Sequence, residues 1–162
     1  MSDSRKFPQL NLPSAPLRIK ECDDGVTRVF CLLRHRFVAL TPEEWVRQHF
    51  VSHLITDLGY PAPLLANEVS ITLNSTSRRC DTVLYSSGGL RPQMIVEYKA
   101  PHIPITREVF DQILRYNMVL RVSLLIVSNG LTHYCCAIDY TNNTARFLSS
   151  IPTYGQLAVC NN

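Results

Sequence analysis

An acid and a lysine flank a single residue at the end of an apolar run in the middle of this chain. The run over residues 94–96 leads into Glu97, Tyr98 and Lys99. Side chains alternate along a strand, so Glu97 and Lys99 project to one face and Tyr98 to the other. Placing two charged groups there is costly unless they pair or bind a ligand. Asp81, on a preceding predicted strand, would complete a cluster of two carboxylates and a lysine, which is what metal-assisted phosphodiester cleavage needs.

Further polar segments precede and follow this cluster along the sequence. Gln112 and Tyr116 lie four residues apart on a helix predicted over residues 106–120, so they share one helix face. The segment TPEEWVRQ occupies residues 41–48, near the start of the chain, and SNG occupies residues 128–130.

In sequence order, these segments resemble known nucleases. The pattern D-(x)15-E-x-K, from Asp81 to Lys99, followed by Q-xxx-Y, resembles the catalytic core of the PD-(D/E)xK nucleases and of their RecB-like branch. With the two outer segments, roughly residues 20–150 resemble the N-terminal nuclease domain of the restriction (R) subunit of type I restriction–modification enzymes. Tyr98 departs from that pattern, which has a small residue or a cysteine there, but its side chain is expected to face away from the acids.

The resemblance implies a metal-dependent deoxyribonuclease with Mg²⁺ as cofactor, for which Mn²⁺ can substitute. Asp81 and Glu97 would each give one carboxylate oxygen to the metal, and the backbone carbonyl of Tyr98 would add a further ligand. Lys99 would orient the attacking water and stabilise the negative transition state. Gln112 would hold Lys99 or that water. The structural alternatives are an ordinary surface ion pair for Glu97 and Lys99, and a solvated helix surface for Gln112.

The resemblance also implies roles at the border of this centre. Glu44, on the first predicted helix, would supply a third carboxylate to the metal; alternatively, it only completes a capping box with Thr41 at the start of that helix. Arg78 and Arg79 would contact backbone phosphates, which gives affinity without sequence choice. Tyr116 would touch a phosphate or brace its helix. The structural alternative for these last three side chains is a solvated surface.

Composition sets broad limits on the function. The chain has 162 residues, an apolar fraction of 46% and a formal net charge of +3, which fit one domain and allow a nucleic-acid partner without arguing for one. Six cysteines show no C-x-x-C and no zinc-site spacing, so we expect reduced thiols in a cytoplasmic protein. No apolar run approaches the ~20 residues of a membrane span. No G-x-x-x-x-G-K-S/T segment indicates an ATP site.

The order of elements predicts an α/β fold of the restriction-endonuclease-like α/β/α type, in which a central mixed sheet is flanked by helices and preceded by an N-terminal β-hairpin. The expected elements are a hairpin over residues 17–33, a helix over 39–59, a hairpin over 68–85, a strand over 93–99, a helix over 106–120, and strands over 122–128, 132–138 and 144–149. The expected domain covers residues 17–155, between a flexible N-terminus (1–16) and a loop-like C-terminal tail (156–162).

Three functional classes remain open from the sequence. The first is a free-standing, metal-dependent DNA endonuclease domain acting in restriction or repair, without the ATP-driven motor of the large R subunits. The second is a nuclease fold that binds nucleic acid or a protein partner but does not cut, and the third is a structural or assembly protein. The first class implies DNA, a second copy of the chain or restriction–modification subunits as partners, and no membrane. Metal binding separates the first class from the other two.

Overall fold

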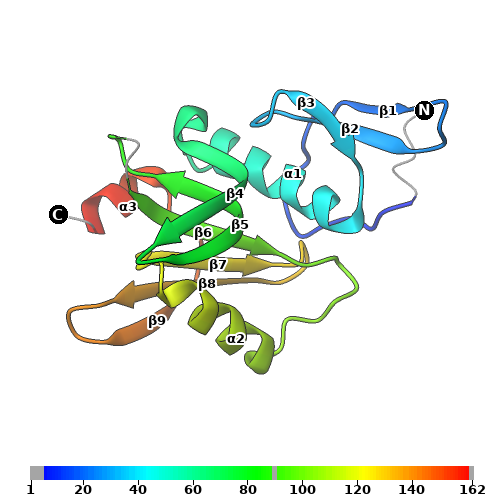
Figure 1. Ribbon diagram of the computed structural model, residues 1–162. Coiled ribbons are helices and arrows are strands. Elements are labelled where there is room, and N and C mark those ends of the chain that lie inside the picture. Colours follow the sequence, from blue (N-terminus) through cyan, green and yellow to red (C-terminus); the bar gives the residue numbers. More distant parts are fainter. Residues whose placement is uncertain (1–5, 89–90, 161–162) are drawn as a thin grey trace.

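A six-stranded sheet lies between helices, and a smaller sheet stands beside the first helix (Figure 1). The computed structural model describes residues 6–88 and 91–160. Helix α1 (Pro42–Thr56) covers one face of the large sheet and α2 (Arg107–Met118) covers the other. This arrangement confirms the predicted α/β fold with a mixed sheet flanked by helices. Within the described residues, no helix is long and apolar enough to cross a membrane.

The strands of the large sheet lie side by side in the order in which they occur along the chain. They are β4 (Leu65–Leu73), β5 (Thr76–Tyr85), β6 (Pro92–Tyr98), β7 (Leu124–Ser128), β8 (His133–Asp139) and β9 (Thr144–Leu148), and a short 3₁₀ helix, η1 (Ala62–Leu64), precedes β4. Strands β6 and β7 pair in parallel, because α2 carries the chain across one face of the sheet between them. The other neighbours pair antiparallel.

Alternating side chains on the inner strands divide the core into two halves. On one face, Val96 and Tyr98 of β6 pack with Phe50 of α1. On the other face, Ile95 of β6 packs with Phe110 of α2. All residues of β7 are buried, which fits a central strand that is covered on both faces. The strands that carry the predicted acids are therefore held from both sides.

Both long helices begin at a threonine cap. The backbone N–H of Glu44 donates to Thr41 Oγ1 at 3.1 Å, and that of Val109 donates to Thr106 Oγ1 at 3.2 Å. Helix α1 is shorter than the predicted range of 39–59, because residue 39 belongs to the strand that precedes it.

The small sheet contains the predicted N-terminal hairpin and one additional strand. Strands β1 (Ile19–Glu21) and β2 (Thr27–Cys31) pair around the expected turn, and β3 (Arg36–Ala39) adds to β2. Strand β3 is missing from the predicted elements because the turn before it contains no glycine or asparagine. His35 takes the left-handed conformation there, with a φ of 53°, which non-glycine residues seldom adopt.

The C-terminal segment differs from the predicted loop-like tail. Residues Tyr154–Cys160 form helix α3, and a reciprocal capping box begins it. The backbone N–H of Gln156 donates to Thr153 Oγ1 at 3.2 Å, and that of Thr153 donates to Gln156 Oε1 at 2.9 Å. Leu157 then packs into the core on the α1 side. The T-x-x-Q signal is visible in the sequence, but the helix that follows it is too short to show a periodic pattern.

Part of the N-terminal segment also packs on the domain. Phe7 stacks on Trp45 with ring centroids 5.3 Å apart, and Leu10 is buried in the core on the α1 side. His133 Nε2 lies 2.9 Å from the backbone oxygen of Asn11, which ties the segment to β8. Residues 1–5 of the predicted flexible segment lie outside the described residues.

Candidate active site

Strands β5 and β6 bring Asp81 next to Glu97. Their antiparallel pairing sets Thr82 opposite Val96, so the next residue of each strand, Asp81 and Glu97, is also opposite its partner. Asp81 Oδ2 accepts the backbone N–H of Tyr98 at 2.9 Å. Thr82 and Val96 are the last paired residues at this end of the two strands. Beyond them, the side chain of Asp81 accepts the N–H of Tyr98 in place of a backbone carbonyl.

The side chain of Glu97 is half-buried, and one of its carboxyl oxygens, Oε1, is enclosed. Its Oε1 has no hydrogen-bond partner among the described residues. Burial, and then the charge and hydrogen bonding of Asp81, raise the pKa of Glu97 to about 9, although the charges of Lys99 and Arg47 oppose this shift. Glu97 therefore keeps a proton at neutral pH when no other cation lies between the two acids.

These two acids fit a hard divalent cation. Such ions prefer oxygen ligands, and a buried carboxylate oxygen without a partner offers one. Among residues 6–88 and 91–160, no group of three or more His, Cys, Asp or Glu side chains is placed to hold a metal. A metal at Asp81 and Glu97 would therefore take its other ligands from water and from the backbone.

Lys99 lies beside this pair of acids without bonding to it. Its backbone N–H donates to the carbonyl oxygen of Ser128 at 2.9 Å, which fixes the chain directly after β6. Its charge lowers the pKa of Glu97, yet within the described residues it forms no ion pair with either acid. The side chain is half-buried. The charge of Lys99 thus acts on Glu97 without an ion pair to either acid, which differs from a simple surface ion pair.

Arg47, on α1, is the cation that contacts the acids directly. Its Nη1 lies 2.5 Å from Glu44 Oε2, and its Nη2 lies 2.6 Å from Glu68 Oε1 and 3.4 Å from Asp81 Oδ1. Burial opposes its charge, but the carboxylates of Glu44, Asp81 and Glu68 outweigh burial and raise the pKa of Arg47. Neither Arg47 nor Glu68 was among the site residues predicted from the sequence. Only the spacing of Glu44 and Arg47, three apart on a helix, could have indicated part of this network.

Glu44 is tied to protein cations rather than to the other acids. It is 6% exposed, and it accepts hydrogen bonds from Arg34 at 2.6 Å, from Gln48 at 2.7 Å and from Arg47. Only half of the expected capping box forms, because the backbone N–H of Thr41 donates to Ala39 instead of to the side chain of Glu44. Glu44 therefore reaches Asp81 through Arg47.

Glu68 holds an unusual backbone conformation next to Asp81. It lies between Asn67 and Val69, which pair with Thr82 and Cys80 of β5, so it stands opposite Asp81. Its φ is 57°, in the left-handed region that costs a non-glycine residue of order 1–3 kcal/mol. Its carboxylate joins Arg47 to Arg79, whose Nε donates to Oε2 at 2.8 Å. One of the left-handed non-glycine residues of the described structure thus lies at the edge of the candidate site.

The structure does not join Gln112 to the acids. Helix α2 turns Phe110, Ile113 and Asn117 toward the sheet, and Gln112 is exposed. Among the described residues, Gln112 has no hydrogen bond to Lys99. Gln112 and Tyr116 lie on one face of α2, as their spacing predicts, but that face is exposed to solvent.

Arg78, Arg79 and Tyr116 lie on the surface with partners of their own. The guanidinium carbon of Arg78 lies 4.3 Å from the centre of the Tyr116 ring, and Arg78 Nε donates to the backbone oxygen of Tyr116 at 3.3 Å. Arg79 bonds to Glu68 while its side chain stays 72% exposed. These contacts connect β5 to α2 and β4, and they leave Arg79 open to solvent.

Tyr98 points away from the acids. Its ring lies 5.7 Å from that of Phe50, and its hydroxyl lies 2.9 Å from Thr82 Oγ1, which in turn donates to Asn67 at 2.7 Å. The side chain is 3% exposed. The departure from the family pattern at this position therefore changes the packing beneath the site and leaves the backbone of Tyr98 beside Asp81.

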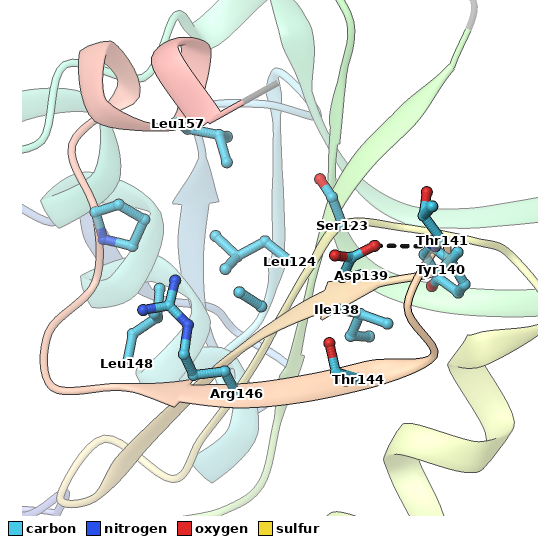
Figure 2. A pocket seen from close by; sticks show the side chains of 12 residues that line it. Ser123, Leu124, Ile138, Asp139, Tyr140, Thr141, Thr144, Arg146, Leu148 and Leu157 are labelled. Atoms are coloured by element: carbon cyan, nitrogen blue, oxygen red, sulfur yellow. Dashed lines mark hydrogen bonds between the residues drawn. The ribbon is translucent and has the colours of Figure 1, made fainter. Parts of the chain in front are cut away.

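A large hollow lies elsewhere on the molecule (Figure 2). It has a volume of about 710 Å³ and lies between β8, β9 and α3, with Ile138, Arg146 and Leu157 in its lining. Asp139, at its rim, accepts the backbone N–H of Thr141 at 2.9 Å and so belongs to a turn. None of the candidate site residues lines this hollow.

Comparison with known proteins gives a family and a fold. The family described as type I restriction enzyme R protein N terminus matches residues 42–152. A solved structure, a fragment of an HsdR subunit assigned to a type I restriction enzyme from Vibrio vulnificus YJ016, matches with a TM-score of 0.53 and 20% sequence identity. The match covers 75% of this chain and 26% of that chain, so this chain spans about a quarter of that structure. No curated protein matches this chain.

Proposed function

Because the chain belongs to the family of type I restriction enzyme R protein N-terminal regions, we propose that it is a metal-dependent DNA endonuclease domain of the PD-(D/E)xK type. It would hydrolyse phosphodiester bonds with Mg²⁺, for which Mn²⁺ can substitute. The observation that carries this proposal is the pair of Asp81 and Glu97. Two adjacent carboxyl groups, one with a buried oxygen that lacks a partner, form the oxygen-rich site that such a cation requires.

In this proposal each residue of the site has a separate task. The metal, when bound, supplies charge neutralisation at the scissile phosphate and a lowered pKa for water. Glu97 would give up its proton to hold the cation, and Asp81 is kept in position by the backbone N–H of Tyr98. Lys99, whose charge acts on Glu97 without pairing with it, would orient the attacking water and stabilise developing negative charge.

The proposal is tested by separating metal binding from cleavage. Titration of Mn²⁺ by calorimetry should show binding to the wild-type protein, which Asp81→Ala and Glu97→Ala abolish while the far-ultraviolet circular dichroism stays unchanged. Lys99→Ala should retain Mn²⁺ binding and lose cleavage by about 10²–10³-fold, the range for removing one group that stabilises transition-state charge. Glu108→Ala, which removes an exposed carboxyl group from α2, is the matched control.

A second function is a nucleic-acid-binding or protein-interaction module on the same fold that does not cut. Two observations favour it: Arg47 already contacts Asp81 Oδ1, and Gln112 is separate from the acids. Wild-type protein that binds DNA but cuts no linear, branched or single-stranded DNA with Mg²⁺ or Mn²⁺ would establish this second function. For either function, the protein partners would be restriction–modification subunits, as the family suggests, or a second copy of the chain, since cutting both strands of DNA usually requires two active sites.

A further inference from the structure

The guanidinium of Arg47 is enclosed by three carboxylates that come from three elements. Its Nη1 contacts Glu44 of α1, and its Nη2 contacts both Glu68 of β4 and Asp81 of β5. The side chain of Arg47 is only 5% exposed, so water and salt screen its charge from these acids weakly. The three acids therefore surround a fixed protein cation.

The charges around this guanidinium are balanced without a metal. Two of the three acids have a second arginine, since Arg34 lies 2.6 Å from Glu44 and Arg79 donates to Glu68 at 2.8 Å. Together with Arg47, three guanidinium groups face three carboxylates. A divalent cation placed among these acids would meet the positive charge of Arg47 at close range, and like charges at such distances repel strongly in a buried site.

The two oxygens of Asp81 have different partners. Oδ1 lies 3.4 Å from Arg47 Nη2, whereas Oδ2 accepts the backbone N–H of Tyr98 at 2.9 Å. Nuclease sites with two metals hold their ions about 3.5–4 Å apart, a spacing at which both ions can share one carboxylate. Arg47 therefore takes one of the two oxygens through which Asp81 could join a pair of ions.

We propose that Arg47 is a positioning residue that takes the place of a second metal ion, so that Asp81 and Glu97 bind a single divalent cation. The guanidinium keeps a permanent positive charge at Asp81, where a second ion would otherwise contribute one. It also orients Asp81 before any metal binds, because Glu44 and Glu68 hold the guanidinium through its two Nη atoms. The inference rests on the proposed function in taking Asp81 and Glu97 as the metal ligands.

A purely structural role for Arg47 leads to a different expectation. An arginine that only joins α1 to the large sheet would stabilise the fold and leave the number of bound ions unchanged. A loss of stability in Arg47 variants fits both roles. The number of divalent cations bound per chain separates them, because only a residue that excludes an ion changes that number when its charge is removed.

The test counts the Mn²⁺ ions bound per chain, by calorimetry and by equilibrium dialysis. Wild-type protein should bind one ion. Arg47→Gln removes the charge and leaves Glu44, Glu68 and Asp81 without their shared cation, so this variant should bind two ions. Arg47→Lys keeps a positive charge among the same acids and should bind one ion, like wild type.

Two further variants show whether the second ion lies where the guanidinium was. Arg79→Gln also takes a guanidinium from Glu68, but the Arg79 side chain is 72% exposed and, within the described residues, bonds to Glu68 and not to Asp81. It should bind one ion. Arg47→Gln/Glu68→Gln removes an acid that would hold the second ion, so it should also bind one. Two ions in either variant would contradict the assigned place.

A second measurement covers an Arg47→Gln variant that is poorly folded without metal. Ions that bind only the folded chain stabilise it by mass action, and two ions give about twice the dependence on the logarithm of the Mn²⁺ concentration that one ion gives. Urea unfolding should show this twofold steeper dependence for Arg47→Gln relative to Arg47→Lys, and equal dependences would contradict the proposal. If Arg47→Gln never folds, the wild-type count decides: one ion supports the proposal and two ions overturn it.

Failure of this inference is distinguishable from failure of the endonuclease proposal. Two ions in wild type, or one ion in both wild type and Arg47→Gln, overturn the role of Arg47 while the metal-dependent function stands. One ion in wild type and two in Arg47→Gln, without cleavage of any DNA, support the role of Arg47 and end the endonuclease proposal. A wild-type protein that binds no Mn²⁺ overturns both.

Discussion

The guanidinium of Arg47 lies 3.4 Å from Asp81 Oδ1 and places a permanent cation beside the carboxylate that would bind a metal. The same guanidinium bonds to Glu44 and Glu68, which come from α1 and β4. Three acids from three elements thus depend on one buried charge. This relationship makes the candidate site part of the folding interface between α1 and the large sheet.

Replacing Arg47 should therefore destabilise the domain strongly. Arg47→Ala leaves the buried Glu44 with reduced compensation, and breaking a buried pair in this way costs about 3–5 kcal/mol. Arg47→Lys should recover little, since an ammonium group cannot make the two-pronged contacts of a guanidinium. Urea unfolding followed by circular dichroism measures both. Arg79→Ala is the control: it also removes a bond to Glu68, but from a largely exposed side chain, so a loss within about 1 kcal/mol is expected. Equal effects of Arg47→Ala and Arg79→Ala would contradict the role of Arg47.

Metal affinity should depend steeply on pH. Glu97 holds a proton up to about pH 9 in the metal-free protein, and a cation must displace that proton. Below that pH, the apparent association constant of Mn²⁺ should rise about tenfold per pH unit if one proton is released. Calorimetry in buffers of different ionisation enthalpy counts the released protons directly. An association constant that does not change between about pH 6 and 8 would show that Glu97 is already ionised.

The metal-free protein should lose stability as the pH rises. The pKa of Glu97 is raised from 4.5 to about 9 by folding, so between these values the folded protein binds more protons than the unfolded chain. Stability therefore falls across this window, by at most about 1.4 kcal/mol per pH unit from this group. Glu97→Gln mimics the protonated acid and should flatten this slope. Urea unfolding at several pH values with EDTA provides the measurement, and parallel slopes for both proteins would refute the assignment.

Tyr98→Phe should affect the fold and leave the metal site alone. The substitution deletes the buried hydroxyl that lies 2.9 Å from Thr82 Oγ1, so a cost of about 1–2 kcal/mol is expected. The backbone N–H that Asp81 accepts is retained. Calorimetry should give the same Mn²⁺ affinity as wild type within experimental error. A large change in affinity would mean that the ring, and not only the backbone of Tyr98, supports the acids.

The alternation of side chains along strands and the order of the elements were sufficient to predict that Asp81 and Glu97 lie on neighbouring strands. Glu97 lies at the end of a buried apolar run, and an antiparallel neighbour puts Asp81 across from it. The α/β class and the central position of β7 follow from equally local signals, namely apolar runs, turn residues and helix caps. Such patterns are readable because each is confined to a short stretch of chain.

The remaining parts of the site depend on contacts between distant residues. Arg47 meets Glu68 and Asp81 across 21 and 34 positions, and no periodic pattern encodes those pairs. The orientation of Gln112 was readable in principle, because Phe110 and Ile113 mark the buried stripe of α2 on another side of that helix. The spacing of Gln112 and Tyr116 shows that they share a face, but it does not identify which face meets the sheet.

Glu68 has a left-handed backbone conformation although it is not a glycine. Glycine would adopt the same φ without strain, and yet a glutamate stands there. Its carboxylate bonds to Arg47 and Arg79, which a glycine could not do. A variant without this carboxylate would relax its backbone locally, but Arg79 would lose its acid partner and Arg47 would keep only Glu44 and Asp81. The least strained backbone and the complete set of ion pairs therefore exclude one another at this position.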